Sequence, residues 1–308
     1  MRGFALTAFD ASPTLRDDVP APTPADREVL VRVHASSVNG ADVAIAGGML
    51  KEMFEHDFPV ILGRDFAGAV ERVGETVARY QVGDEVFGFL LHANPTVHEG
   101  SWTELITVPE DNFVAAKPRN LDMAHAGAAP LAAITAVAAL DALAPAEGET
   151  VLVIGAAGGV GSFFVQLAAG AGAHVIASGL REDTGYLEEL GAAEILDRTT
   201  DLGITVRERH PDGVDAILDV VSFTPQDTLL KAGGRLASPL GSAGEGAGRF
   251  NLMAEPTPEN LQRVAELLDE SKLRVAIQNS YELAQAGEAL AAFASTHTQG
   301  KLSVTVSN

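Results

Sequence analysis

The chain has 308 residues, 46% of them hydrophobic, which is enough for two domains that each bury a core. The 21 Lys and Arg against 42 Asp and Glu leave a net charge of −21, so we expect neither nucleic acid nor an anionic membrane as a partner. Cysteine is absent, which excludes disulfides, thiolate nucleophiles and cysteine-ligated metals.

The first part of the chain is predicted to be rich in β-strands. Branched and alternating residues at 29–34, 68–73, 83–88 and 104–108 are typical of strands, and Gly and Pro separate them at short intervals. Such closely spaced strands predict a compact, partly open barrel.

The character of the sequence changes near Pro118. Residues 121–144 are rich in Ala and predict a helix, which we expect to be buried rather than membrane-spanning because it contains His125, Pro130 and Asp141. Predicted strands and helices then alternate, which indicates a parallel sheet covered on both faces. The strands are expected at 151–154, 173–178, 193–196, 214–218 and 234–237, and the helices at 163–169, 184–190 and 259–269. Strand character returns at 302–306.

The glycine cluster that follows the strand at 151–154 is the most informative segment. Its residues Ala156, Gly158 and Gly161 fit a G-x-G-x-x-G pattern with Ala at the first position, between a strand and a helix. Small residues let the backbone approach a pyrophosphate, and the N-terminus of the helix offers free N–H groups. The sequence therefore predicts dinucleotide binding, and an ordinary glycine-rich turn is the weaker alternative. The predicted binding residues are Ala156, Ala157, Gly158, Gly159, Val160 and Gly161.

Several segments, taken together and in order, resemble the zinc-free quinone oxidoreductase branch of the medium-chain dehydrogenase/reductase superfamily. The segments that carry the resemblance are residues 36–42, 59–68, 82–88, 100–104, 131–136, the glycine loop, 230–236 and 300–302. It implies an α/β chain with a GroES-like, partly open β-barrel catalytic domain at 1–117 and 273–308, and a Rossmann domain with a doubly wound parallel sheet at 118–272. Members of the family are commonly oligomers, and we expect a homodimer.

The same resemblance bears on zinc. Zinc-dependent relatives have Gly-His-Glu where this chain has Gly63, Arg64 and Asp65. Because Arg stays protonated, it cannot replace the imidazole as a ligand. His92 and His98, in the loop that replaces the cysteine-rich lobe, are expected to be solvated. We therefore expect no metal.

The choice of cofactor depends on the end of the second predicted strand of the α/β region. An acidic residue there would bond the ribose hydroxyls of NADH and repel a 2′-phosphate. The chain has Ser178 at this point, and Arg181 follows as a charged partner for a phosphate. These two residues favour NADPH, whereas Glu182 and Asp183 keep NADH open as the alternative.

In the family, the reaction is hydride transfer from the nicotinamide to an acceptor in a cleft between the domains. Asn39 is the best polar candidate for contact with the nicotinamide or the substrate carbonyl, and Thr135 lies in a helix that faces the cofactor in relatives. Their alternatives are an Asn turn and core packing. We also count Val220, Leu240 and Lys301 among the cofactor-binding residues, with a solvated lysine as the alternative for Lys301.

The predicted function is NADPH-dependent, zinc-independent reduction of a small apolar quinone or an α,β-unsaturated carbonyl. Residues 42–50, on the substrate side, are mostly small and apolar, which suits such an acceptor. Two alternatives stay open, an enoyl-thioester reductase of the same family and a non-catalytic NADPH-binding sensor or structural protein. The N-terminus lacks the pattern of a signal peptide, so we expect a cytoplasmic protein.

Overall fold

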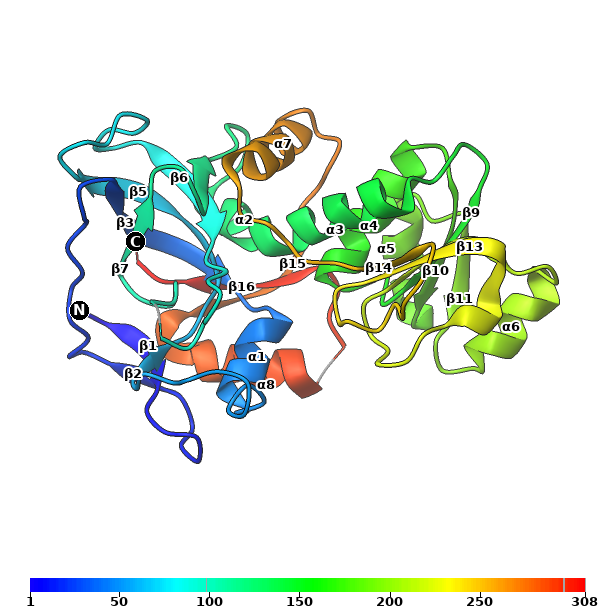
Figure 1. The fold of residues 1–308 in the computed structure, drawn as a ribbon, viewed down its shortest axis with the longest axis horizontal. Helices are drawn as coiled ribbons and strands as arrows, with labels where there is room; N and C mark the ends of the chain where they lie inside the picture. The colour runs from blue at the N-terminus through cyan, green and yellow to red at the C-terminus, as the bar shows by residue number, and fades with distance from the viewer. Residues whose placement is uncertain (98, 296, 308) are drawn as a thin grey trace. The chain divides into compact units, whose positions relative to one another are not determined.

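The computed structural model describes residues 1–97, 99–295 and 297–307 (Figure 1). The chain forms two compact units. The first comprises residues 1–131, 255–270 and 275–308, and the second comprises residues 132–254 and 271–274. These edges differ from the predicted domain edges at 117/118 and 272/273, because residues 118–131 and 255–270 group with the first unit and residues 273–274 with the second. The backbone N–H of Phe113 donates to Pro256 O, and Arg119 pairs with Asp269, which ties that segment to the first unit.

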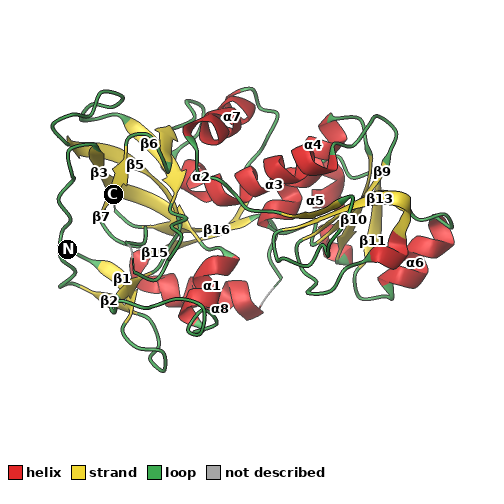
Figure 2. Cartoon of the chain, viewed as in Figure 1, coloured by secondary structure: helices red, strands yellow, loops and turns green. Residues whose placement is uncertain are grey.

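The first unit contains two sheets. A three-stranded sheet has the order β2-β1-β4, and a seven-stranded sheet has the order β15-β16-β3-β5-β6-β8 with β7 on β3 (Figure 2). The strands are β1 (Gly3–Leu6), β2 (Thr14–Arg16), β3 (Glu28–Ser37), β4 (Val60–Ile61), β5 (Asp65–Val73), β6 (Glu85–Phe89), β7 (Leu105–Pro109), β8 (Val114–Ala116), β15 (Ile277–Glu282) and β16 (Lys301–Thr305). The helices are α1 (Gly40–Ala46), α2 (Met123–Ala128), α7 (Pro258–Asp269) and α8 (Ala286–Ser295). Phe4, Phe66 and Trp102 belong to the apolar core of this unit.

The second unit is built on a parallel six-stranded sheet with the order β11-β10-β9-β12-β13-β14. The strands are β9 (Thr150–Ile154), β10 (His174–Gly179), β11 (Glu194–Asp197), β12 (Val214–Asp219), β13 (Leu230–Ser238) and β14 (Arg249–Asn251). The helices are α3 (Pro130–Leu143), which begins at the edge of the unit, α4 (Gly159–Gly170), α5 (Thr184–Glu189) and α6 (Leu202–Arg209). Since all six strands run the same way, their carboxyl ends share one edge, where ligands bind in open α/β sheets.

The predicted fold class is confirmed, with some differences in the elements. The single helix predicted at 121–144 is wrong. Pro130 has no N–H to donate, so the chain breaks there, and Pro130 becomes the first residue of α3. Short 3-10 turns at Arg181–Asp183, Asp227–Leu229 and Leu283–Gln285 complete the described elements. No helix among the described residues combines the length and apolar character that crossing a membrane requires.

Candidate active site

Asn39 occupies the junction between β3 and α1 in the first unit. It caps α1 with extended backbone angles and is only 7% exposed. Its backbone N–H donates to Asp42 Oδ2 at 2.8 Å, and its side-chain Nδ2 donates to Asp65 Oδ2 at 2.8 Å. The backbone and the amide of Asn39 are therefore each held by a buried carboxylate.

Asp65 begins β5 and collects donors from four parts of the first unit. Its Oδ2 accepts from Ser37 Oγ at 2.6 Å and from Asn39, and it lies 3.5 Å from Lys301 Nζ. Its Oδ1 accepts from the backbone N–H of Leu131 at 2.8 Å. A carboxylate with this many donors is well solvated by the protein, although its side chain is fully buried.

Lys301, the first residue of β16, is the counterion of Asp65. The pairing of β16 with β3 brings it to Asn39, and its Nζ donates to Asn39 Oδ1 at 2.6 Å and to Val38 O at 3.1 Å. Burial lowers the pKa of Lys301, and the carboxylates of Asp65 and Asp42 oppose that shift. With Asp65 as a third acceptor, all three ammonium hydrogens have partners inside the first unit. Asn39 keeps one Nδ2 hydrogen that these contacts do not use.

A second buried ion pair lies beside the first. Asp42 Oδ1 is 3.8 Å from Arg64 Nε and accepts from the backbone N–H of Gly63 at 3.0 Å. Arg64 also donates to Ile61 O at 3.0 Å and to Pro95 O at 3.3 Å. Burial raises the pKa of Asp42 to about 6, and the Arg64 charge and the Asn39 N–H counteract part of that rise.

The glycine loop of the second unit connects β9 to α4, and its conformation depends on residues without side chains. Gly155 has a φ of 85°, which favours glycine, and a Cβ there would lie 2.6 Å from Val220 Cγ2. A Cβ on Gly161 would lie 2.2 Å from Gly155 O. Gly158 caps α4 without a side chain, so the first N–H groups of that helix are not covered by one. The loop fits the predicted pyrophosphate cradle, and its sharp turn is made by Gly155 rather than by Ala156.

Ser178 and Arg181 flank the end of β10. Ser178 is buried one residue before the strand ends, and its Oγ accepts from the backbone N–H of Gly155 at 3.2 Å. Arg181 is exposed at the start of the next turn. Arg198, which follows β11, donates its backbone N–H to Gly179 O at 2.9 Å, so a second arginine follows the neighbouring strand. Asp183 is buried and accepts from the backbone N–H of Leu180 at 2.7 Å, so its carboxylate caps the turn.

The other predicted residues of the second unit lie as follows. Val220 follows β12 and packs against Gly155, because β12 lies beside β9 with Asp219 opposite Ile154. Leu240 follows β13 and is 41% exposed. Both are at the carboxyl edge of the sheet, together with the glycine loop and Ser178. Thr135 is buried within α3.

Sequence reasoning missed Asp65 and Gly155. Asp65 belongs to the Gly63-Arg64-Asp65 segment, which the sequence relates only to metal binding. A buried Lys301 needs a carboxylate as its counterion, but no local sequence pattern indicates which residue that is. Gly155 follows directly on the last strand residue, where a strand-to-helix turn commonly needs a positive φ. That position was a usable signal.

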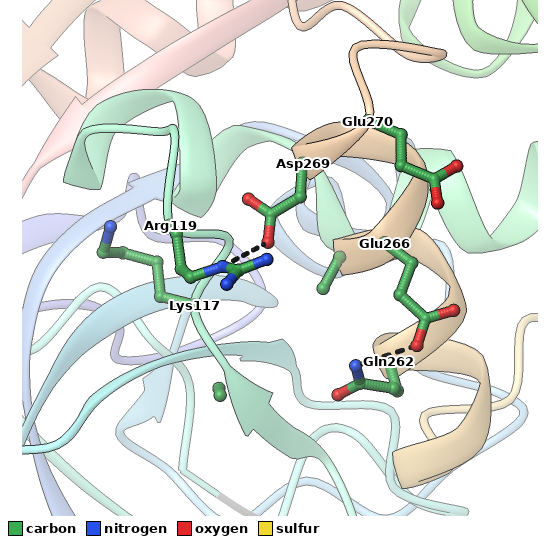
Figure 3. A pocket seen from close by; sticks show the side chains of 8 residues that line it. Lys117, Arg119, Gln262, Glu266, Asp269 and Glu270 are labelled. Carbon is green, nitrogen blue, oxygen red and sulfur yellow. Dashed lines mark hydrogen bonds and ion pairs between the residues drawn. The ribbon is translucent and has the colours of Figure 1, made fainter.

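Other groups in the described residues do not add a metal site. No set of three or more His, Asp or Glu there is placed to hold a metal ion. The ring of His92 contacts Phe113, and His98 lies outside the described residues. A groove of about 310 Å³ between β8 and α7 is lined by charged groups (Figure 3). Two contacts within its lining, Arg119 with Asp269 and Gln262 with Glu266, join four of its six polar side chains in pairs, and we assign it no part in the reaction.

Comparison with known proteins identifies the class. A family model for the alcohol dehydrogenase GroES-like domain matches residues 25–119, and one for zinc-binding dehydrogenases matches residues 190–304. The chain is thus an oxidoreductase with a GroES-like domain and a nicotinamide-binding type of sheet. It belongs to the quinone oxidoreductase branch of the medium-chain dehydrogenase/reductase superfamily.

Individual relatives agree with this assignment. The chloroplast envelope quinone oxidoreductase homolog of Arabidopsis thaliana is 29% identical over 93% of this chain and 92% of its own length. The 2-methylene-furan-3-one reductase of Solanum lycopersicum is 31% identical over 90% of this chain and 71% of its own length. The quinone oxidoreductase of Coxiella burnetii has a solved structure that superposes with a TM-score of 0.88 at 28% identity, covering 100% of this chain and 99% of that one.

Proposed function

We propose that this oxidoreductase uses NADPH, without zinc, to reduce a quinone or an α,β-unsaturated carbonyl compound. The observation that carries the proposal is the arrangement around Asn39. Two buried ion pairs hold this residue, and its amide keeps one N–H that could donate to an acceptor oxygen. Such a preorganised donor stabilises the negative charge that hydride transfer places on that oxygen.

The residues that would hold the cofactor lie in the second unit. The uncovered N–H groups at the start of α4 would bond the pyrophosphate, and the small residues 156–161 would let it approach. Arg181 and Arg198 would pair with a 2′-phosphate, because guanidinium groups bind phosphate oxygens with two parallel hydrogen bonds. When bound, the nicotinamide supplies the hydride, and the protein contributes binding and orientation.

The first unit would act on the acceptor. Lys301 is engaged by three acceptors, so it acts by fixing the Asn39 amide rather than by giving up a proton. A quinone suits this site because its reduced oxygen takes a proton readily from solvent. The predicted contact of Lys301 with the cofactor stays a prediction, as does the contact of Thr135.

The test is a substrate screen with a matched variant. Purified enzyme is assayed with NADPH and NADH against a water-soluble benzoquinone, a conjugated enone and a crotonyl thioester. We expect fastest turnover with NADPH and the quinone or the enone. Asn39→Ala should lower kcat by about 10²-fold or more, the scale for losing one such donor, whereas Asn120→Ala, in an exposed turn, should not. Preferred turnover of the thioester would favour the enoyl-thioester alternative instead.

Zinc independence has its own test. Arg64 stands where zinc-dependent relatives have a ligand, and it is fully buried and engaged with Asp42 and two carbonyls. Elemental analysis should find no stoichiometric zinc, and a chelator should leave turnover intact. One equivalent of zinc that is lost together with activity would contradict this proposal.

Two further expectations remain predictions. A homodimer is expected from the family, and sedimentation would measure it. A cytoplasmic location is expected from the sequence, and fractionation of the source cells would test it. Because the chain is an oxidoreductase by family, turnover is favoured over the sensor alternative.

A further inference from the structure

Arg64 is an unusual residue to find inside a small barrel. Its side chain and that of Asp42 are both fully buried, although a lone buried charge costs several kcal/mol. Its guanidinium reaches Ile61 O and Pro95 O, and Nε has no hydrogen-bond partner among the described residues although Asp42 Oδ1 is 3.8 Å away. Apolar residues of similar volume often replace such pairs without loss of stability. Stability alone therefore does not explain why Arg64 and Asp42 are buried together.

The contacts of Asp42 supply that reason. Its two oxygens are divided between two backbone N–H groups, Oδ2 accepting from Asn39 and Oδ1 from Gly63. Gly63 has a φ of 92°, and a Cβ there would lie 2.2 Å from Trp102, so its backbone has little freedom to shift. Asp42 thus ties the backbone of Asn39 to a rigid point beside Arg64.

We propose that Arg64 and Asp42 form a positioning pair that holds the backbone of Asn39 for the reduction, and that protonation of Asp42 releases it. The inference rests on the proposed role of Asn39. Protonation places an O–H on one of the two carboxyl oxygens, so that oxygen becomes a poorer acceptor for its backbone N–H. Either Asn39 or Gly63 then loses its hydrogen bond, and the amide donor of Asn39 shifts.

The electrostatic surroundings of Asp42 place this change in an accessible pH range. The charged groups that act on it are Arg64 and Asp65 from β5 and its approach, and Lys301 from β16. The only charged residue of α8, which packs against α1, is the exposed Glu288. Burial dominates, and it raises the pKa of Asp42 from 3.8 to about 6.

Stability and activity should then depend on pH in opposite directions. Because the folded-state pKa of Asp42 is raised, this group binds its proton more tightly in the folded protein, so its contribution to stability is full below the unfolded value and is lost as pH rises through about 6. The ionised form, which we assign to the working enzyme, is the less stable one. A purely structural ion pair would not separate the two properties in this way.

The experiment compares wild type with Asp42→Asn, Arg64→Met, the double variant and Asp122→Asn. Asp122 caps α2 by accepting from the His125 N–H, so its variant changes the same residue type at the start of a different helix. In wild type and in Asp122→Asn, kcat should fall as pH drops from about 8 to about 5 with a midpoint near 6, while the KM for NADPH stays within about twofold. Asp42→Asn should lose that step and lower kcat by about 10–100-fold at high pH.

Arg64→Met removes the countercharge and leaves Asp42 buried, so the midpoint of the pH step should move up by about one unit or more. In the double variant the step should vanish. Unfolding midpoints measured over the same pH range should rise toward low pH in wild type relative to Asp42→Asn. A kcat step that persists unchanged in Asp42→Asn would overturn the proposal.

A readout without turnover separates this inference from the proposed function. Hydrogen exchange of the Asn39 and Gly63 amides, corrected for intrinsic rates, should lose protection as pH falls through about 6 in wild type. The step should be absent in Asp42→Asn and present in Asp122→Asn. If the exchange step is found but no quinone or enone is reduced, the proposed function fails and the positioning pair stands. If protection is independent of pH, the pair is not a switch.

Discussion

The two units hold their candidate functional groups in different ways. In the first unit, side chains from α1, β5 and β16 converge on Asn39, and the contacts are buried hydrogen bonds that join this neutral residue to charged groups. In the second unit the candidate binding groups belong to the backbone, which forms a glycine turn and a helix start that no side chain covers. The first arrangement is vulnerable to the loss of a charge, and the second is vulnerable to the gain of a methyl group.

The difference suits what each unit is proposed to bind. A pyrophosphate is the same in every dinucleotide, so backbone N–H groups suffice to hold it. An acceptor carbonyl develops charge only during the reaction, so its donor has to be fixed in advance. The predictions below test this contrast from the largest expected effect to the smallest.

The largest effect is expected for Lys301→Met. This change leaves the Asp65 carboxylate buried without its cation, and breaking a buried pair in this way costs about 3–5 kcal/mol. Urea unfolding should show the loss. The double variant Asp65→Asn/Lys301→Met should recover part of it. A loss below about 1 kcal/mol would mean that the donors from Ser37, Asn39 and Leu131 satisfy Asp65 on their own.

Gly161→Ala and Gly158→Val test the second unit as a matched pair. A Cβ on Gly161 would lie 2.2 Å from Gly155 O, so Gly161→Ala should destabilise the unit by about 1–3 kcal/mol. A Cβ on Gly158 would lie 3.6 Å from the same oxygen, which is an ordinary contact. A Cβ is thus tolerated at Gly158, so Gly158→Val should cost less stability than Gly161→Ala, apart from the small penalty of valine at an N-cap, and should lose NADPH affinity because its side chain obstructs the phosphates. Unchanged NADPH binding by calorimetry would refute the assignment of the loop.

Arg181→Ala tests cofactor choice. If Arg181 pairs with a 2′-phosphate, NADPH binding should weaken by about 1.5–3 kcal/mol and NADH binding should hardly change. Arg209→Ala is the control, because Arg209 lies 3.6 Å from Glu194 at the end of α6 and follows no carboxyl end of the sheet. Equal losses for both cofactors would assign Arg181 a structural role only.

The smallest effect is expected at Glu194, which contacts His174 at 2.6 Å and His210 at 3.2 Å. Burial raises the pKa of Glu194, but the histidines outweigh it, and the net shift is downward. A lowered folded-state pKa stabilises the protein above the unfolded value, and that stability is lost as pH falls through the folded one. Since the pair is partly solvated, Glu194→Gln should cost under about 1 kcal/mol near neutral pH and less in acid. A larger cost would show that the cluster is better shielded than its exposure indicates.

Local patterns predicted the second unit well. Each predicted strand from 151–154 to 234–237 coincides with an observed one, because buried parallel strands are continuous apolar runs between turn residues. In the first unit, strand β15 was missed, since Ile277–Glu282 is mostly exposed and carries no apolar alternation. Strand β14 was missed because three residues are too short to show a pattern.

For the active-site candidates too, local patterns indicate single residues but not the contacts between distant ones. Asn39 and Lys301 could be singled out by residue type, but their contact joins positions 262 residues apart in the chain. That contact depends on the register of β16 against β3, in which Ser303 lies opposite Ser37. A shift by one residue would turn Lys301 to the other face of the strand. Sequence alone does not specify such a register, so the network around Asp65 became visible only in three dimensions.

The order of the segments along the chain has a consequence for biosynthesis. The sheet of the second unit is complete once residue 251 has been made, whereas the first unit still lacks β15 and β16. Domains commonly fold as units during synthesis, and contacts between distant residues form slowly. We therefore expect the second unit to fold first, while the chain is still on the ribosome. The N-terminal barrel would wait with Asp65 uncompensated until Lys301 emerges, so its final closure would be a late event.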